Sequence, residues 1–279
     1  MVFFDGPVVV LRRTEAEGVH RLGEELSQTF VIWLGIKTIG ENFFSKVQEA
    51  KCRRVFFAAT TEVFWRHSHF GFLDDFEFVS KSIVTGTLEL LKYVLNTKAR
   101  LIYSASSSKF GNNGKDENLS PYSFFKSKNV ELIKNLGDWF NLEYSICYFF
   151  NVYGRNHIKT GNYATVIAIF EEQFKNKETL TVVSPGTQSR DFTHIDDICS
   201  GLIKATEKNI RAEYHLRFGE NFQIIDVAKT FSEKITYIKE RRGERFTSEF
   251  FASDTNETLN WYPTINLIDY INDFKKNSK

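Results

Sequence analysis

Residues 101–126, LIYSASSSKFGNNGKDENLSPYSFFK, decide how this chain folds, because they hold a strand, a hydroxyl-rich turn and the start of a helix. The run Leu101-Ile102-Tyr103-Ser104 is short and apolar, which is typical of a buried strand. Ser120 can cap a helix that begins near residue 122, and Pro121 suits its first turn. The stretch therefore predicts a strand–turn–helix unit with three serines, residues 106–108, where the strand ends.

The same alternation extends in both directions from this unit. Further short apolar runs predict buried strands at residues 8–11, 30–34, 54–59 and 144–150. Helical patterns lie between them, at residues 41–50, 84–95 and 122–140. Buried strands that alternate with amphipathic helices predict an α/β fold, in which a parallel sheet is covered on both faces. We expect this domain to occupy residues 1–154.

The pattern changes after Gly154. Helices are predicted at residues 165–175, 196–208, 223–233 and 267–275, and short strands at 179–183, 214–217 and 235–238. This predicts a smaller mixed α/β domain over residues 155–279, with segments that return to the large sheet. We expect it to pack at the carboxyl ends of the parallel strands, where open α/β sheets bind ligands.

Composition and charge exclude several classes of function. The chain has 279 residues, of which 42% are hydrophobic and 25% charged, and its net charge of +1 favours neither nucleic acid nor an acidic membrane surface as partner. The three cysteines, Cys52, Cys147 and Cys199, have no disulfide or metal-ligand spacing. We expect a cytoplasmic protein with reduced thiols, without a metal, a signal peptide or a transmembrane segment.

Tyr122 and Lys126 are the first candidate catalytic residues. At a spacing of i, i+4 they share one face of the predicted helix. An ammonium beside a phenol stabilises the phenolate, so we expect Lys126 to lower the pKa of Tyr122 and make it an acid/base. Ser106 can hydrogen-bond a substrate hydroxyl whose proton Tyr122 removes. This group suits interconversion of an alcohol and a ketone, and the hydride then requires a nicotinamide cofactor, because no side chain carries one.

Four motifs in order make the chain similar to a known family. They are Ser106-Ser107-Ser108 with Phe110-Gly111, then Ser120-Pro121-Tyr122 with Lys126, then Asn151-Val152-Tyr153-Gly154, and finally residues 188–197, QSRDFTHIDD. From about residue 54 to residue 262 the chain resembles the extended short-chain dehydrogenases/reductases, specifically their nucleotide-sugar epimerases and dehydratases. The resemblance implies a Rossmann-like parallel sheet with a smaller substrate domain.

The resemblance also implies a role for each matched residue. Ser106, Tyr122 and Lys126 would be catalytic, and Lys126 would also hold the nicotinamide ribose. The implied cofactor is NAD, with NADP left open, and the implied cofactor-binding residues are Ala58, Ala59, Tyr122, Lys126 and Phe149. The substrate would be a nucleotide sugar, with UDP as the expected nucleotide, and its diphosphate would contact Asn151, Arg190 and Arg241. Thr87 matches a Gly-Thr pair at a helix start, and a homodimer is a further expectation.

Departures from the family pattern reduce the number of family reactions that the chain is expected to catalyse. The 4,6-dehydratases of the family carry Asp-Glu and its decarboxylases a glutamate at the positions of Ser107 and Ser108, so the sequence favours a 4-epimerase. Ile83 stands where an asparagine is frequent. Arg217 and Phe218 interrupt a Gly-x-Gly-like turn.

No Gly-x-x-Gly-x-x-Gly turn, which holds the cofactor pyrophosphate, occurs in the sequence. Residues 8–11 resemble the family's second strand, so we expect the chain to begin one βα unit late. Two alternatives therefore stay open beside the epimerase. One is a remnant or partner subunit that binds a nucleotide sugar without competent NAD binding, and the other is a reductase that releases a keto sugar.

Overall fold

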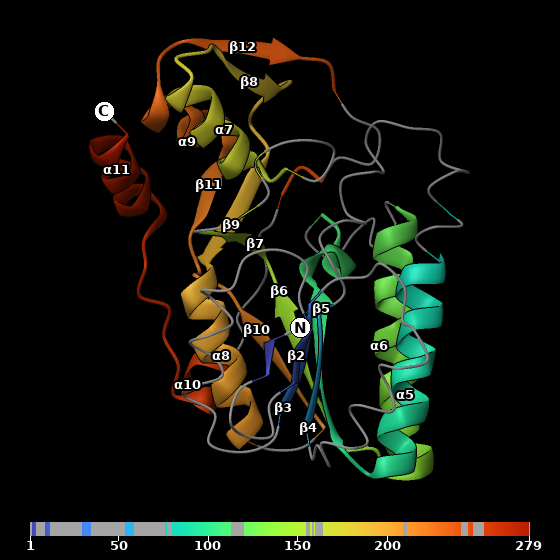
Figure 1. Cartoon of the computed structure of the whole chain (residues 1–279). Helices are drawn as coiled ribbons and strands as arrows, with labels where there is room; N and C mark the ends of the chain where they lie inside the picture. Colours follow the sequence, from blue (N-terminus) through green and yellow to red (C-terminus); the bar gives the residue numbers. More distant parts are fainter. Residues whose placement is uncertain are drawn as a thin grey trace.

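A computed structural model of the chain describes its carboxyl-terminal two thirds almost continuously. The described residues are 80–112, 120–154, 157, 159, 164–208, 211–240, 245–247 and 254–278, together with residue 76 and the strand backbones at 2–3, 9–11, 30–34 and 54–58. Figure 1 shows the large sheet with two smaller sheets beyond one of its ends.

A seven-stranded sheet forms the centre of the fold. Its strand order is β1-β2-β3-β4-β5-β6-β10, and every neighbouring pair is parallel except β1 with β2. The strands are β1 (Val2–Phe3), β2 (Val9–Leu11), β3 (Phe30–Leu34), β4 (Arg54–Ala58), β5 (Arg100–Ser106), β6 (Tyr144–Phe149) and β10 (Ala212–Leu216). The predicted α/β fold with a parallel sheet is confirmed.

The central strands bury both faces, as their continuous apolar sequences require. In β5, Tyr103 packs in one hydrophobic cluster and its neighbour Ile102 in another, on the opposite face of the sheet. The first cluster lies under α5 (Gly86–Thr97) and α6 (Pro121–Phe140), and the second under α8 (Ile195–Glu207). Figure 1 accordingly shows α5 and α6 side by side on one side of the sheet and α8 on the other.

Helix α6 begins as its sequence predicts. The Ser120 side chain accepts a hydrogen bond from the Ser123 N–H at 3.2 Å, Pro121 occupies the first turn, and Asn141 ends the helix in a left-handed conformation. Helix α5 is preceded by one turn of π-helix, η1 (Ser80–Thr85). Such turns are rare and often lie at functional sites.

The carboxyl-terminal part builds two small sheets around a third hydrophobic cluster. One has the order β11-β9-β7 and the other pairs β12 with β8. The strands are β7 (Asn151–Tyr153), β8 (Leu180–Val183), β9 (Ser189–His194), β11 (Asn221–Gln223) and β12 (Ile235–Ile238). The helices are α7 (Val166–Lys175), α9 (Ile224–Phe231), α10 (Thr255–Leu259) and α11 (Leu267–Asn277).

Most predicted elements recur within a few residues, but some were missed. Strands β1, β7, β9 and β11 and helix α10 were not predicted, and neither were the turns η1 and η2 (Ser107–Phe110). The predicted helix at 41–50 lies outside the described residues. The division at residue 154 stays a prediction, although β10 joins the large sheet while the strands before and after it do not.

Strand order in the large sheet bears on ligand binding. From β2 to β6 the described strands lie in the sheet in the same order as in the chain, and β3 pairs directly with β4. Open α/β sheets bind dinucleotides where the strand order reverses. Among the described strands of this sheet there is no such reversal.

Two further results concern membranes and metals. Within the described part of the chain, no helix has the length and apolar character needed to cross a bilayer. The same residues include no group of three or more His, Cys, Asp or Glu side chains that could hold a metal ion.

Candidate active site

Ser106 and Tyr122 meet where β5 ends and α6 begins. The two side chains are hydrogen-bonded, and the phenol is buried, with 7% of Tyr122 exposed. Ser106 caps the following turn η2, because its hydroxyl oxygen accepts bonds from the Ser108 N–H at 3.2 Å and the Ser108 hydroxyl at 2.9 Å. The capping bonds fix the Ser106 hydroxyl at the carboxyl end of a central parallel strand.

Lys126 lies one helical turn further, in the interior. Its Nζ donates to the carbonyl oxygen of Ser104 at 2.7 Å and lies 4.9 Å from the centre of the Tyr103 ring. Only 2% of the residue is exposed. Burial lowers the pKa of Lys126 to about 7, because a charged amine loses solvation in the interior.

The pKa of Tyr122 differs in direction from the sequence-based expectation. Burial raises the pKa of the phenol, and the hydrogen bond with Ser106 opposes this rise. The expected lowering by Lys126 is therefore not what the structure has, because desolvation of the phenolate outweighs the stabilising contacts. Both side chains are buried in an environment that favours their uncharged forms.

Asn129 is a buried polar residue beside this pair that the sequence analysis missed. Its Nδ2 lies 3.0 Å from the Ile83 carbonyl oxygen, 2.9 Å from Thr87 Oγ1 and 3.2 Å from the Tyr103 hydroxyl. An amide nitrogen has two N–H donors, so it cannot donate to all three at full strength. The spacing of residues 122, 126 and 129, one helix face, is the signal that could have found it.

Thr87 and Tyr103, the partners of Asn129, are fully buried. The network therefore joins α6 to the first turn of α5, to the π-helical turn and to β5, directly beneath Lys126. Thr87, which the resemblance singled out, is part of this structural support.

The remaining candidate residues lie in two groups. In the large sheet, Phe149 is opposite Ser106, and the backbone of Ala58 is opposite Ser104. In the three-stranded sheet, Asn151 is opposite Phe192, two residues after Arg190. Arg190 is 9% exposed and donates to the carbonyl of the preceding residue at 2.9 Å. Ala59 and Arg241 lie outside the described residues.

Arg245 contacts the turn after Ser106, and the sequence analysis did not select it. Its Nη1 donates to the Ser107 carbonyl oxygen at 2.7 Å, and both terminal nitrogens lie 3.5 Å from the Ser107 hydroxyl. These residues are 138 positions apart, so no local spacing could reveal the contact.

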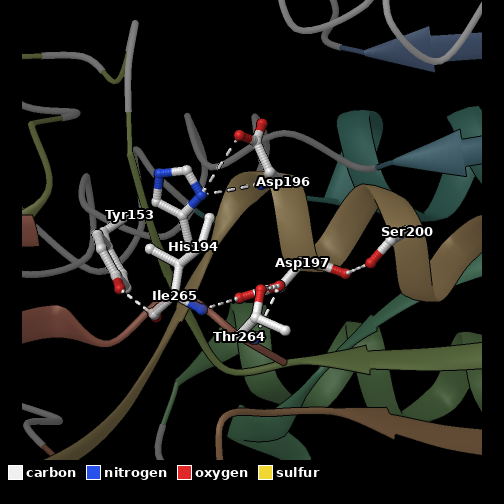
Figure 2. A network of polar contacts seen from close by, with 7 residues as sticks. All are labelled: Tyr153, His194, Asp196, Asp197, Ser200, Thr264 and Ile265. Carbon is white, nitrogen blue, oxygen red and sulfur yellow. Dashed lines mark hydrogen bonds and ion pairs between the residues drawn. The ribbon is translucent and has the colours of Figure 1, made fainter. Parts of the chain in front are cut away.

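The last residues of the motif at 188–197 hold neighbouring segments of the fold together. The Asp197 carboxylate, 5% exposed, accepts bonds from the backbone N–H groups of Thr264 and Ile265, both at 3.0 Å. Figure 2 shows these contacts together with the hydrogen bond from Tyr153 to the Ile265 carbonyl, at 2.8 Å. The His194 ring, also in Figure 2, accepts a bond from the Asp196 N–H at 3.2 Å. The motif therefore fastens the segment before α11 to the start of α8.

Asp191, in the same motif, holds the turn that departs from the family pattern. Its buried carboxylate accepts from the N–H groups of Phe218 and Gly219, and Arg217 Nε lies 3.1 Å from it. Arg217 also covers the ring of Phe150, at 5.6 Å. The substituted turn is thus stabilised by an ion pair.

The parallel sheet and the serine–tyrosine–lysine group at its carboxyl edge define an extended short-chain dehydrogenase/reductase. Comparison with family models gives the same result more narrowly, because residues 47–217 match the NAD dependent epimerase/dehydratase family. The chain belongs to this family.

Relatives in the family differ in reaction. The chain is 30% identical over 154 residues to a Methanocaldococcus jannaschii protein that carries the provisional name UDP-glucose 4-epimerase. It is 27% identical over 207 residues to UDP-glucuronic acid decarboxylase 3 of Arabidopsis thaliana. It is also 29% identical over 203 residues to a UDP-glucuronate 4-epimerase of Thermodesulfobacterium geofontis. The matches cover 53%, 67% and 67% of this chain and 50%, 60% and 61% of the relatives. The chain thus spans half to three fifths of their length.

Solved structures show the same fold. A UDP-glucose 4-epimerase from Thermotoga maritima, determined with UDP-glucose, matches with a TM-score of 0.77 and 20% identity, over 94% of this chain and 95% of the other. A UDP-glucuronic acid 4-epimerase from Bacillus cereus, in complex with a fluorinated UDP-glucuronic acid and NAD, gives 0.75 and 23%, over 94% and 85%.

Proposed function

We propose that the chain catalyses NAD-dependent 4-epimerisation of a UDP-linked hexose through a transient 4-keto sugar. The observation that carries this proposal is the hydrogen bond between Tyr122 and Ser106, with buried Lys126 on the same helix face. The family consists of NAD-dependent enzymes that modify nucleotide sugars, and 4-epimerases are among the relatives and the matching structures.

The side chains divide the chemistry between them. The Ser106 hydroxyl orients the reacting sugar hydroxyl, and Tyr122 removes its proton and later returns it. Lys126, whose pKa is about 7, is partly protonated at neutral pH and can stabilise the phenolate as it forms. Ser107 and Ser108 provide no carboxylate to eliminate water, so re-reduction of the ketone on its other face completes the cycle.

The residues present fit NAD at one end. Tyr122 and Lys126 can hold the nicotinamide ribose, and Phe149 and Ala58 lie at the same carboxyl edge of the sheet. When bound, NAD accepts and returns the hydride. At the other end the fit is poor, because the sequence has no Gly-x-x-Gly-x-x-Gly turn for the pyrophosphate.

The substrate side of the proposal rests on Asn151, Arg190 and Arg241 as contacts of the UDP diphosphate. Guanidinium groups suit this task because they bind phosphate oxygens through two hydrogen bonds. The site requires neither nucleic acid nor a membrane, and we propose a cytoplasmic enzyme that can form a homodimer.

Substitution of Tyr122 by Phe tests the mechanism. We expect kcat for interconversion of UDP-glucose and UDP-galactose, measured by chromatography, to fall by about 10²–10⁴-fold, because only the acid/base hydroxyl is lost. Tyr214→Phe is a matched control: the Tyr214 hydroxyl is buried without a hydrogen-bond partner in the described structure, so its loss should leave the rate unchanged. Full activity of the Tyr122→Phe variant would rule out the mechanism.

Strand order favours a second candidate function. Since the described strands show no reversal beside β4 and the glycine turn is missing from the sequence, the chain could bind a nucleotide sugar without competent NAD binding. Calorimetry with UDP and with NAD separates the two. Binding of UDP alone supports this second candidate, whereas tight binding of NAD excludes it.

A further inference from the structure

Glu171 is a buried carboxylate that contacts three segments of the carboxyl-terminal part of the chain. It lies on α7, and only 2% of the residue is exposed. Its Oε2 lies 2.9 Å from His157 Nε2 and 3.5 Å from Lys159 Nζ, and its Oε1 accepts a hydrogen bond from the Tyr270 hydroxyl at 2.8 Å. His157 and Lys159 come between β7 and α7 in the chain, and Tyr270 lies on α11. The carboxylate therefore joins α7 to α11 and to the segment that follows β7.

The charge of this carboxylate depends on its partners. Burial alone would raise the pKa of Glu171, but the three contacts hold it below its ordinary value, so the group is ionised at neutral pH. Replacement of a buried ion pair by apolar side chains often costs no stability, whereas directional hydrogen bonds fix the relative positions of the segments that they join. The His157 ring also depends on Glu171, because its Nδ1 is buried without a hydrogen-bond partner in the described structure. The network therefore determines where the segment after β7 lies.

Strand β7, which precedes this segment, contacts the same helix. The Tyr153 ring lies 5.1 Å from the Tyr270 ring, and the Tyr153 hydroxyl donates to a backbone carbonyl just before α11 at 2.8 Å. Asn151, a proposed contact of the diphosphate, lies two residues before Tyr153 on this strand. Strand β7 also pairs with β9, the strand that carries Arg190. The contacts of Glu171 therefore support the strand of Asn151 and, through strand pairing, that of Arg190.

We propose that Glu171 is a positioning residue for the nucleotide sugar, because it holds β7 and the segment after it so that Asn151 is aligned with the diphosphate. The inference rests on the proposed function, which assigns the diphosphate to Asn151. Glu171 acts through these segments and not by contact with the ligand. It therefore affects the affinity for the nucleotide, whereas the Ser106–Tyr122 pair, where β5 ends and α6 begins, determines the chemical step.

Glu171→Gln tests this role, because it keeps the size of the side chain and removes its charge. We expect calorimetry with UDP to show about tenfold weaker binding, the effect of about one lost hydrogen bond. KM for UDP-glucose should rise by the same factor, while kcat at saturating substrate stays unchanged. Tyr270→Phe removes one donor to the carboxylate but keeps the ring that packs against Tyr153. It should weaken UDP binding as well, by less than Glu171→Gln does.

The matched control is Glu213→Gln. Glu213 also accepts a hydrogen bond from a tyrosine, Tyr148, at 2.6 Å, and it pairs with a lysine, Lys134. It lies on β10, in the large sheet. This variant should lower the free energy of unfolding without a change in UDP affinity. Urea unfolding of each variant measures its stability, and Tyr270→Phe retains the test where Glu171→Gln does not fold.

The possible results separate this inference from the proposed function. Equal UDP affinity of the unmodified chain and the folded Glu171→Gln variant refutes the positioning role and leaves the proposed function intact. An equal loss of UDP affinity in Glu213→Gln refutes it too, because any loss of stability would then have the same effect. A fall in kcat with an unchanged KM also overturns it. Absence of UDP binding in the unmodified chain refutes the proposed function, and this inference with it.

Discussion

Substitution of Lys126 by Met is expected to stabilise the protein near neutral pH and to lose this advantage as the pH rises. Methionine is close to the lysine stem in length and is unbranched, so it can fill the same space. The residue is 2% exposed, and burial of its amine lowers the pKa from 10.5 to about 7. A charged amine in this position therefore opposes folding.

The sign of the pH dependence follows from proton binding. Because the folded-state pKa of Lys126 is below its unfolded value, the unfolded chain binds more protons between pH 7 and about 10.5. The free energy of unfolding of the unmodified protein therefore rises with pH in this window. The pKa shift corresponds to about 5 kcal/mol in total, and the rise between pH 7 and 9.5 to about 3 kcal/mol.

Two contacts oppose the burial cost at pH 7. They are the hydrogen bond to the Ser104 carbonyl at 2.7 Å and the position over the Tyr103 ring at 4.9 Å. Each contributes about 1–3 kcal/mol. The Lys126→Met variant should accordingly be more stable than the unmodified protein at pH 7, and this advantage should shrink by about 3 kcal/mol between pH 7 and pH 9.5.

Urea unfolding at pH 7, 8 and 9.5, followed by tryptophan fluorescence, measures the difference. Lys128→Met is the control on the same helix, because its side chain is 51% exposed and pairs with Glu131. Its difference from the unmodified protein should not change over this range. Parallel stability curves for Lys126→Met and the unmodified protein would show that Lys126 titrates normally, and would refute the argument.

Two further predictions concern the polar networks. Asn129→Leu removes the amide that contacts Ile83, Thr87 and Tyr103 beside Lys126. We expect kcat to fall at least tenfold and the pH profile of kcat to shift, while KM for the nucleotide sugar changes less than threefold. A changed KM with an unchanged pH profile would contradict a positioning role for Asn129. Asp197→Ala removes a buried carboxylate that accepts hydrogen bonds from two backbone N–H groups, and should lower the free energy of unfolding by about 2–4 kcal/mol in urea titrations. An effect no larger than that of the more exposed Asp196→Ala would contradict the structural role.

The sequence predicted a helix or strand correctly where residues within that segment, such as a helix cap or an apolar run, determine its structure. The start of α6 follows from Ser120 and Pro121, and strand β3 from an apolar run whose bounds, Phe30–Leu34, match the prediction. Strands β7 and β9 were missed because they carry the polar residues of the motifs, such as Asn151 and Arg190. Their extended conformation depends on pairing with each other, which residue patterns within a single segment do not reveal.

The candidate site likewise has features that local sequence predicts and features that depend on the whole fold. The shared helix face of Tyr122 and Lys126 was predictable from their spacing, and the position of Ser106 from the end of a predicted strand, whereas their selection as site residues needed the surrounding motifs. The direction of the Tyr122 pKa was not, because it depends on burial by surrounding segments. Arg245 could not be found at all without the fold, since its contact with Ser107 joins segments 138 residues apart.

The two halves of the site have different consequences for catalysis. The described structure brings Ser106 and Tyr122 together with Lys126 on the same helix face, whereas the given sequence has no Gly-x-x-Gly-x-x-Gly turn for a cofactor pyrophosphate. Backbone hydrogen bonds to a charged group contribute about 1.5–3 kcal/mol each. Under the proposed function, a chain that makes two fewer such bonds would bind NAD roughly 10²–10⁴-fold more weakly. Activity should therefore depend on added NAD, and an assay without it would mistake weak cofactor binding for an inactive site.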